Sequence, residues 1–441
     1  MTLTSATTSV HPFEEWQPPP VDSLESTKLS HGFLSDMILK IMYFRGQLTG
    51  YQIAEHLRLP FQTVLHSIMD HLKREQFCEV KGSGGLGAGA YQYILTNKGA
   101  NRAREQLERS TYASAAPVPW EDYLASIRAQ GTRRLRVNQQ MMRRALGHLV
   151  LDEKVFQKVG PAVNSGRSIF LYGPPGNGKT TIAESVGRMI LGNDMYIPFA
   201  VEVDGQIIKV YDEINHHAVE DTNLNGSVST GSLGAGRRDG RWLKINRPVI
   251  MVGGELTMDG LDLVYDSNNK YYEAPFQMKA NGGMFLIDDF GRQQIRPRDL
   301  LNRWIVPMEK NIDFLALHTG RKIEVPFNVL LVFSTNLPPG DLVDEAFLRR
   351  IRHKIEITSP SFEAYREIFR RVCEHRKVHY DEQAIRYLLQ DHYIKNNRPL
   401  RANHPRDILD QLMDICSYAG MEPALTKELL DRASESYFVD L

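Results

Sequence analysis

The chain has 441 residues, 42% hydrophobic and 24% charged, which excludes disordered, collagen-like and membrane-spanning classes and predicts two or three domains. The 53 basic and 53 acidic side chains cancel, so bulk charge gives no reason to expect nucleic acid or an anionic membrane as a partner. Three separated cysteines fit reduced thiols. With neither a signal peptide nor an apolar run of membrane length, we expect a cytoplasmic protein without membrane contact.

The N-terminal part predicts a small DNA- or protein-binding fold. Residues 1–30 are rich in Ser, Thr and Pro and are expected to form a disordered lead-in. Hydrophobic spacing then predicts three helices, two strands around a Gly-rich turn, and a closing helix, at 33–43, 51–57, 61–75, 77–80, 91–95 and 97–108. This order resembles a winged helix-turn-helix over residues 31–112. Residues 82–87 match G-x-G-x-x-G, but we do not expect a dinucleotide site there, because a strand follows the match and such a site needs a helix.

The rest of the chain divides by pattern. Residues 113–150 are expected to form a linker, beginning with the stretch 114–119, and a basic helical region with six arginines and no acid between 125 and 151. Buried strands alternating with helices from Ser168 onward predict an α/β fold with a parallel sheet. We place this core at 151–358, with an insertion at 195–283, and a helical domain at 359–441.

A phosphate-binding loop follows the first strand of this core. The apolar residues 168–172 run into a full match to G-x-x-x-x-G-K-[ST], and a helix is expected directly after it. Backbone N–H groups of the loop and the helix N-terminus would surround phosphates, Lys179 would add a positive charge, and Thr180 would supply a hydroxyl to Mg²⁺. The predicted ATP-binding residues are Gly173, Pro174, Pro175, Gly176, Asn177, Gly178, Lys179, Thr180 and Thr181.

A second apolar run, 284–287, ends in two acidic residues. Such a strand end supplies the carboxylate that holds Mg²⁺ in P-loop enzymes, so Asp288 is the predicted metal ligand with Thr180. Asp289 is expected to orient or deprotonate the attacking water. Glu is usual at that position, and the shorter Asp side chain reaches less far.

These motifs resemble those of the AAA+ ATPase superfamily over about residues 140–441. The strand 329–333 leads to Asn336, which resembles the sensor 1 residue, and 346–351 resembles the helix end that carries an arginine finger. Arg350 is favoured over Arg349 as that finger, and Arg406 in Asn403-His404-Pro405-Arg406 resembles sensor 2. The resemblance implies an all-α lid at 359–441 and a Mg²⁺-dependent ATPase that assembles as a ring, most often a hexamer.

Two hairpins are predicted beside the core motifs. Residues 201–210 turn at Asp-Gly, and 312–325 turn at Thr319-Gly320. The second resembles the pre-sensor 1 hairpin of MoxR-like proteins and sigma-54 activators, which implies pore contacts for Arg321 and Lys322; a plain solvated turn is the alternative. The stretch 223–240 is expected to be mobile. His216 and His217 with nearby acids are read as a solvated acidic surface and not as a metal site.

Two functions stay open from the sequence. The resemblance is closest to bacterial ATPases described as having chaperone activity, which implies remodelling of a protein partner. The alternative is a DNA-associated regulator or loader that uses the winged helix and the arginines between Arg128 and Arg144. Residues 31–110 carry ten basic and seven acidic side chains, a modest excess for a DNA-binding module, so protein docking and DNA binding are both retained.

Overall fold

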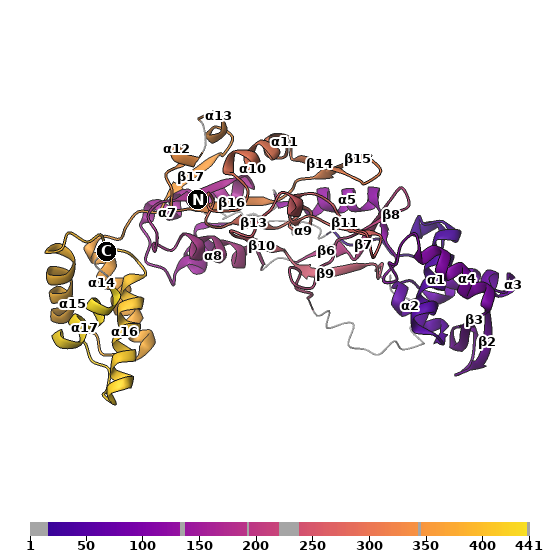
Figure 1. The fold of residues 1–441 in the computed structure, drawn as a ribbon, viewed down its shortest axis with the longest axis horizontal. Helices are drawn as coiled ribbons and strands as arrows, with labels where there is room; N and C mark the ends of the chain where they lie inside the picture. The colour runs from indigo at the N-terminus through magenta and orange to yellow at the C-terminus, as the bar shows by residue number, and fades with distance from the viewer. Residues whose placement is uncertain (1–15, 133–136, 192–193, 220–237, 343–344, 439–441) are drawn as a thin grey trace, which may run out of the picture.

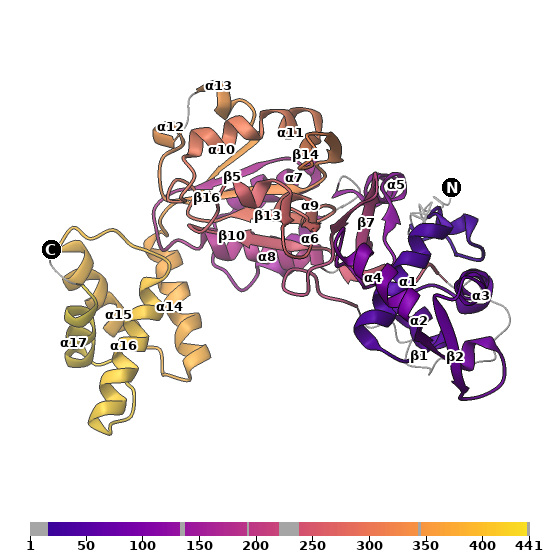
Figure 2. The ribbon, with the colours of Figure 1, turned by 45° about the vertical axis from the view of Figure 1, so that its right-hand side comes forward.

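The computed structural model describes residues 16–132, 137–191, 194–219, 238–342 and 345–438. The molecule is elongated, with an N-terminal domain at one end, C-terminal helices at the other, and two β-containing regions between them (Figures 1 and 2). Among the described residues, no helix combines the length and the apolar character that a membrane crossing needs.

The core is a five-stranded parallel sheet, as predicted, with strand order β10-β13-β16-β5-β17. The three central strands, β13, β16 and β5, are buried on both faces, which explains their continuous apolar runs. The strands are β5 (Ile169–Tyr172), β10 (Val249–Val252), β13 (Met284–Ile287), β16 (Leu330–Thr335) and β17 (His353–Glu356). Residues of β10 lie inside the predicted insertion 195–283, so the inserted residues form two blocks on either side of a core strand.

Alternating side chains of these strands bury against helices on opposite faces. Leu171 and Leu286 pack toward α6, α7 and α8, whereas Phe170 and Phe285 pack toward α10 and its neighbours. The helices are α6 (Gln139–Leu146), α7 (Glu153–Ser165), α8 (Lys179–Leu191), α10 (Pro297–Arg303), α11 (Ile305–Lys310), α12 (Pro339–Leu342) and α13 (Glu345–Leu348). The result is a three-layer α/β arrangement in which the carboxyl ends of the strands share one edge.

A second region, here called the bridging domain, joins the core to the N-terminal domain. It combines a five-stranded sheet, β11-β12-β8-β7-β4, with the pair β6–β9, helix α5 and the hairpin β14–β15 around one hydrophobic cluster. Its elements are β4 (Val118–Pro119), α5 (Trp120–Gln130), β6 (Asp194–Pro198), β7 (Ala200–Val203), β8 (Gln206–Lys209), β9 (Trp242–Asn246), η5 (Asp259–Leu261), β11 (Val264–Asp266), β12 (Tyr271–Glu273), α9 (Phe276–Lys279), β14 (Ile312–Ala316) and β15 (Lys322–Pro326).

Both predicted hairpins are confirmed. In β7–β8 the turn residues Asp204 (φ 51°) and Gly205 (φ 76°) have positive φ, as a two-residue turn with this twist requires. In β14–β15 the turn contains Gly320 at φ 83°.

Two stretches expected to be flexible are packed. Ala115, Ala116 and Val118 of the predicted linker are buried. Ala116 belongs to the hydrophobic cluster of the N-terminal domain, and Val118 lies in β4, which pairs with β7 and extends the bridging sheet. In the predicted lead-in, Trp16 packs edge-to-face on Trp242 with ring centroids 5.1 Å apart, and Val21 is buried. Residues 1–15 and most of the stretch 223–240 lie outside the described residues.

The N-terminal domain contains the predicted helices and strands in the predicted order. A short strand, β1, joins the hairpin to give a sheet of order β1-β3-β2. Thr49 forms a capping box with Gln52 that begins the second helix, and Thr96 caps α4. The elements are η1 (Glu25–Thr27), α1 (His31–Arg45), β1 (Leu48–Thr49), α2 (Gly50–Leu57), η2 (Phe61–Leu65), α3 (His66–Arg74), β2 (Cys78–Ser83), η3 (Ala88–Ala90), β3 (Tyr91–Leu95) and α4 (Asn97–Leu107).

The described residues after 361 form helices around their own hydrophobic cluster. They are α14 (Phe362–Arg376), α15 (Glu382–Leu388), η6 (Leu389–Ile394), α16 (His404–Ala419) and α17 (Lys427–Tyr437).

Candidate functional site

The glycine-rich loop lies between β5 and the first residue of α8, as its motif requires. Gly173, Gly176 and Gly178 all have positive φ (136°, 76° and 82°), which turns the backbone sharply and favours glycine. A Cβ on Gly173 would lie 2.3 Å from the Ile357 carbonyl oxygen, and one on Gly176 would lie 2.1 Å from Asn403 Oδ1. The glycines therefore permit both the turn and the close approach of two other segments.

Lys179 lies at the centre of the loop and is only 6% exposed. Its ammonium donates to the carbonyl oxygens of Gly173 and Pro174, both at 2.9 Å, and to Asn336 Oδ1 at 2.6 Å. Burial lowers the pKa of Lys179, against the attraction of Asp288 and Asp289. The loop thus orients a buried cation with oxygen atoms of uncharged groups.

The carboxylate at the end of β13 contacts the first turn of α8. Thr180 Oγ1 donates to Asp288 Oδ2 at 2.9 Å and lies 3.1 Å from Oδ1. A hydroxyl and a carboxylate are the hard oxygen ligands that Mg²⁺ takes from a protein when phosphates and waters complete its shell. These two residues therefore fit the predicted metal site, and no cluster of three or more acidic, His or Cys ligands competes with them in the described part of the chain.

Asp289 and Asn336 meet at the neighbouring strand end. Asn336 Nδ2 donates to Asp289 Oδ1 at 3.3 Å, so one amide contacts both Lys179 and Asp289. Asp289 is exposed and has φ 47°, a left-handed conformation that Asp tolerates better than most residues. The backbone turns there because Phe290 N donates to the Ser334 carbonyl oxygen at 2.7 Å. This turn directs the carboxylate toward the Lys179 side of the sheet edge.

The three predicted arginines lie outside this cluster and pair with acids. Arg350 donates to Glu309 of α11 at 2.6 Å, and Arg349 pairs with Glu345 one turn earlier. Arg406 is 62% exposed and donates to Asp407 at 3.0 Å. Pro175 is exposed at the loop tip, and the Thr181 carbonyl oxygen accepts from Ser185 inside α8.

The C-terminal region reaches the loop through residues that the sequence did not single out. Asn177, which is buried, accepts from Ala402 N at 3.2 Å and donates to Ser359 Oγ at 3.4 Å. Asn403 N donates to the Gly176 carbonyl oxygen at 2.9 Å. Arg401 donates to Ser359 Oγ at 2.9 Å. No motif marked Ser359 or Arg401. Arg401 lies two residues before the Asn-His-Pro-Arg segment, whereas no sequence signal pointed to Ser359.

The hairpin β14–β15 is attached to the bridging domain. Arg321 forms an ion pair with Asp204 at the tip of β7–β8, the Tyr272 hydroxyl hydrogen-bonds to the His318 ring, and His318 N donates to the same hydroxyl at 2.9 Å. Lys322 is exposed.

His216 is buried and hydrogen-bonded to Asp212 N and the Lys279 carbonyl oxygen. It is therefore a core residue and not part of the solvated surface expected from the sequence.

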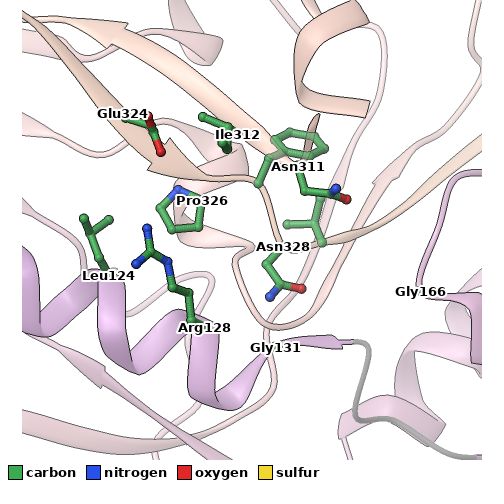
Figure 3. Close-up of a pocket in the computed structure, with 11 residues that line it drawn as sticks. Leu124, Arg128, Gly131, Gly166, Asn311, Ile312, Glu324, Pro326 and Asn328 are labelled. Atoms are coloured by element: carbon green, nitrogen blue, oxygen red, sulfur yellow. The ribbon is translucent and has the colours of Figure 1, made fainter. Parts of the chain in front are cut away.

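A separate cavity of about 330 Å³ lies between α5 and the base of this hairpin (Figure 3). Arg128, the first arginine of the basic segment, extends from α5 toward Pro326, with Glu324 on the facing strand. Arg143 pairs with Glu153, and Arg144 is exposed. Arg133, Arg134 and Arg136 lie outside the described residues.

Comparison with known proteins gives one partial sequence match and several weak structural likenesses. Residues 361–436 match a family described as "Domain of unknown function (DUF8689)", and no curated protein matches the chain. The chain resembles NtrX from Brucella abortus in complex with ADP, with 14% identity and a TM-score of 0.38 over 65% of this chain and 56% of NtrX. A second NtrX structure is covered over 62% of its length, so the chain spans less than two thirds of these relatives.

Two further solved structures are similar at the same level. The RuvB Holliday junction branch migration motor of Thermotoga maritima has 14% identity and a TM-score of 0.36, over 66% of this chain and 70% of RuvB. Domain III of the replication initiation protein DnaA from the same organism has 13% identity and a TM-score of 0.36, over 66% of this chain and 96% of that chain. TM-scores this low support no argument about fold or activity.

Proposed function

We propose that this protein is a Mg²⁺-dependent ATPase of the AAA+ type. The main support is that five side chains lie together at the carboxyl edge of one parallel sheet: Lys179, Thr180, Asp288, Asp289 and Asn336. These residues come from three strand ends that are distant in the sequence. Together they offer a buried cation, two oxygen ligands for a metal, a free carboxylate and a polar amide, which is the set that phosphoryl transfer to water requires.

Each residue has a part in the proposed reaction. Lys179 and the loop N–H groups bind the phosphate chain and stabilise the charge that builds up on it. Thr180 and Asp288 hold Mg²⁺, which when bound neutralises phosphate oxygens. Asp289 accepts a proton from the attacking water, or orients that water, and Asn336 fixes the Asp289 carboxylate relative to Lys179.

We propose a ring as the working assembly, most often a hexamer in this superfamily. Arg350 lies two residues after α13, where the resemblance places an arginine finger that acts on the neighbouring subunit. Its pairing with Glu309 orders the side chain in the single chain. Residues 359–441 would then be the lid, and the contacts of residues 402 and 403 with the loop give such a lid a route to the nucleotide.

A protein partner that the motor remodels is favoured over DNA by the surface of the N-terminal domain, which we interpret as a winged helix. In its third helix, Asp70 forms an ion pair with Lys73 and lies 3.3 Å from His66 Nδ1, which places a carboxylate on the face that would meet phosphates. The turn between β2 and β3 carries Leu86, 99% exposed, and no basic residue. The exposed Leu86 and the carboxylate of Asp70 suit docking of a protein better than contact with the phosphates of a DNA backbone.

The second candidate, a DNA-associated regulator or loader, is favoured by Arg128 and Arg144. Both are exposed, and neither has an ion-pair partner within the described residues. A salt titration of binding to duplex and single-stranded DNA decides between the two, because phosphate contacts give a steep loss of affinity with salt. Absence of salt-sensitive binding would remove the DNA hypothesis.

The ATPase proposal is tested by Asp289→Asn. We expect phosphate release to fall about 100- to 10,000-fold, the range for loss of a general base, while ATP still binds. Asp414→Asn, an exposed carboxylate of α16, is the matched control and should leave turnover unchanged. Normal hydrolysis by Asp289→Asn would show that another group activates the water, and absence of ATP binding by the unaltered protein would refute the proposal itself.

A further inference from the structure

Arg401 is a second basic side chain near the loop, besides Lys179, that forms no ion pair within the described residues. It is partly buried, and its Nη1 donates to the Ser359 hydroxyl at 2.9 Å. Arg406, in contrast, pairs with Asp407 and is mostly exposed. A guanidinium has five N–H donors in a planar fork that fits carboxylates and phosphates. One hydroxyl leaves most of those donors available for an anionic ligand.

Arg401 also lies beside the phosphate-binding loop. Its neighbour Ala402 donates to Asn177, and Asn403 donates to Gly176. Asn177 in turn bonds to Ser359, the same hydroxyl that accepts from Arg401. These hydrogen bonds hold residues 401–403 against the phosphate-binding loop.

We propose that Arg401, held by Ser359, contacts the phosphate chain of the bound nucleotide, in the place that the sequence motif assigns to Arg406. This rests on the proposed ATPase function and identifies the residue through which the C-terminal helices sense phosphate. The segment 401–403 is attached to the loop by backbone hydrogen bonds, so a contact between Arg401 and phosphate links nucleotide binding to the position of those helices. Arg406 instead pairs with Asp407 in the first turn of α16.

The test measures binding of ATP and of inorganic tripolyphosphate to the full chain, the latter by competition with a fluorescent ATP analogue. Tripolyphosphate has neither base nor sugar, so it isolates the phosphate contact. Arg401→Ala and Arg401→Gln should weaken both ligands about 10- to 100-fold, as expected for loss of charge-assisted hydrogen bonds. Arg406→Ala is the matched control and should weaken them by less than about threefold, as for an exposed ion pair.

Several outcomes would overturn the assignment. If Arg401→Gln folds with an unchanged unfolding midpoint and binds both ligands as tightly as the unaltered protein, Arg401 does not contact phosphate, although the ATPase proposal stands. A loss for ATP with none for tripolyphosphate would place Arg401 at the base or sugar. A larger loss for Arg406→Ala than for Arg401→Ala would restore the motif assignment. If the unaltered protein binds neither ligand, both proposals fail.

Discussion

The proposed nucleotide site and the bridging domain differ in the groups that contact their positively charged side chains. In the bridging domain, the buried Arg241 pairs with Asp239, and the partly buried Lys279 pairs with Asp212. In the site, Lys179 is held by carbonyl and amide oxygens that leave its charge unneutralised. A paired buried charge stabilises a scaffold, whereas a cation without an acid is ready for an anionic ligand. The identity of the partner, more than burial itself, separates structural from functional cations here.

The largest effect expected from this difference is at Lys179. Lys179→Ala removes the one buried cation of the loop and should weaken ATP binding about 100- to 10,000-fold, the sum of two charge-assisted hydrogen bonds. Because Lys179 neutralises no buried carboxylate by direct contact, the unfolding midpoint should change little. Calorimetric titration with ATP and thermal unfolding measure the two quantities. A large loss of stability with retained binding would show that Lys179 is a structural cation, as in the bridging domain.

The opposite result is expected at Arg241. This side chain is 2% exposed, donates to both oxygens of Asp239, and also donates to the carbonyl oxygens of Thr27 and Pro117. Arg241→Ala leaves a buried carboxylate without its partner, so the unfolding free energy of this region should fall by about 3–5 kcal/mol. Urea unfolding followed by tryptophan fluorescence measures the loss, since Trp242 is adjacent.

The exposed pair between Arg321 and Asp204 is the control for Arg241. Arg321→Ala should cost less than about 1 kcal/mol, because water screens that pair. Equal losses of unfolding free energy in Arg241→Ala and Arg321→Ala would contradict the assignment of Arg241 as a buried structural cation. A loss of ATP-binding free energy in Arg241→Ala that is larger than its loss of unfolding free energy would contradict it too.

The same two regions differ in how far the sequence predicted them. The loop residues and Asp288, Asp289 and Asn336 sit at strand ends, and parallel strands bring such ends to one edge, so local patterns were sufficient to anticipate their meeting. The bridging domain is assembled from pairings between distant segments, such as β4 with β7 and β8 with β12. No local pattern encodes those pairings, and for that reason the sequence predicted a linker at 114–119, where the structure has the buried strand β4.

Arg401 and Arg406 show that the sequence also fails to predict the partners of single side chains. The motif that marked Arg406 gives its place in the sequence, but the partner of an arginine is decided by tertiary structure. Asp407 is adjacent to Arg406 in the sequence, whereas Ser359 is 42 residues from Arg401. The motif therefore located the segment, and the structure shows that Arg401 and Arg406 have different partners.

The smallest expected effect concerns Lys40, a buried lysine of the N-terminal domain. Lys40 is 5% exposed, and its ammonium donates to the Ser110 carbonyl oxygen at 3.2 Å, so it resembles Lys179 in having no acid in direct contact. Burial lowers the pKa of Lys40 to about 8, against the attraction of Asp36. Unlike Lys179, it adjoins no loop that could bind phosphate. The structure therefore makes it a destabilising buried charge without a ligand.

The sign of the pH dependence follows from that lowered pKa. Between about pH 8 and 10.5 the folded chain loses the Lys40 proton while the unfolded chain keeps it, so stability rises with pH by at most about 1.4 kcal/mol per pH unit. Lys40→Met removes the charge, so its stability advantage should be largest below pH 8 and shrink toward pH 10.5. Taking the difference between the two proteins cancels other titrating groups. A difference independent of pH would show that Lys40 is neutral or paired in the folded domain, and a loss of ATP binding in Lys40→Met would show that an unneutralised lysine marks a ligand site here as well.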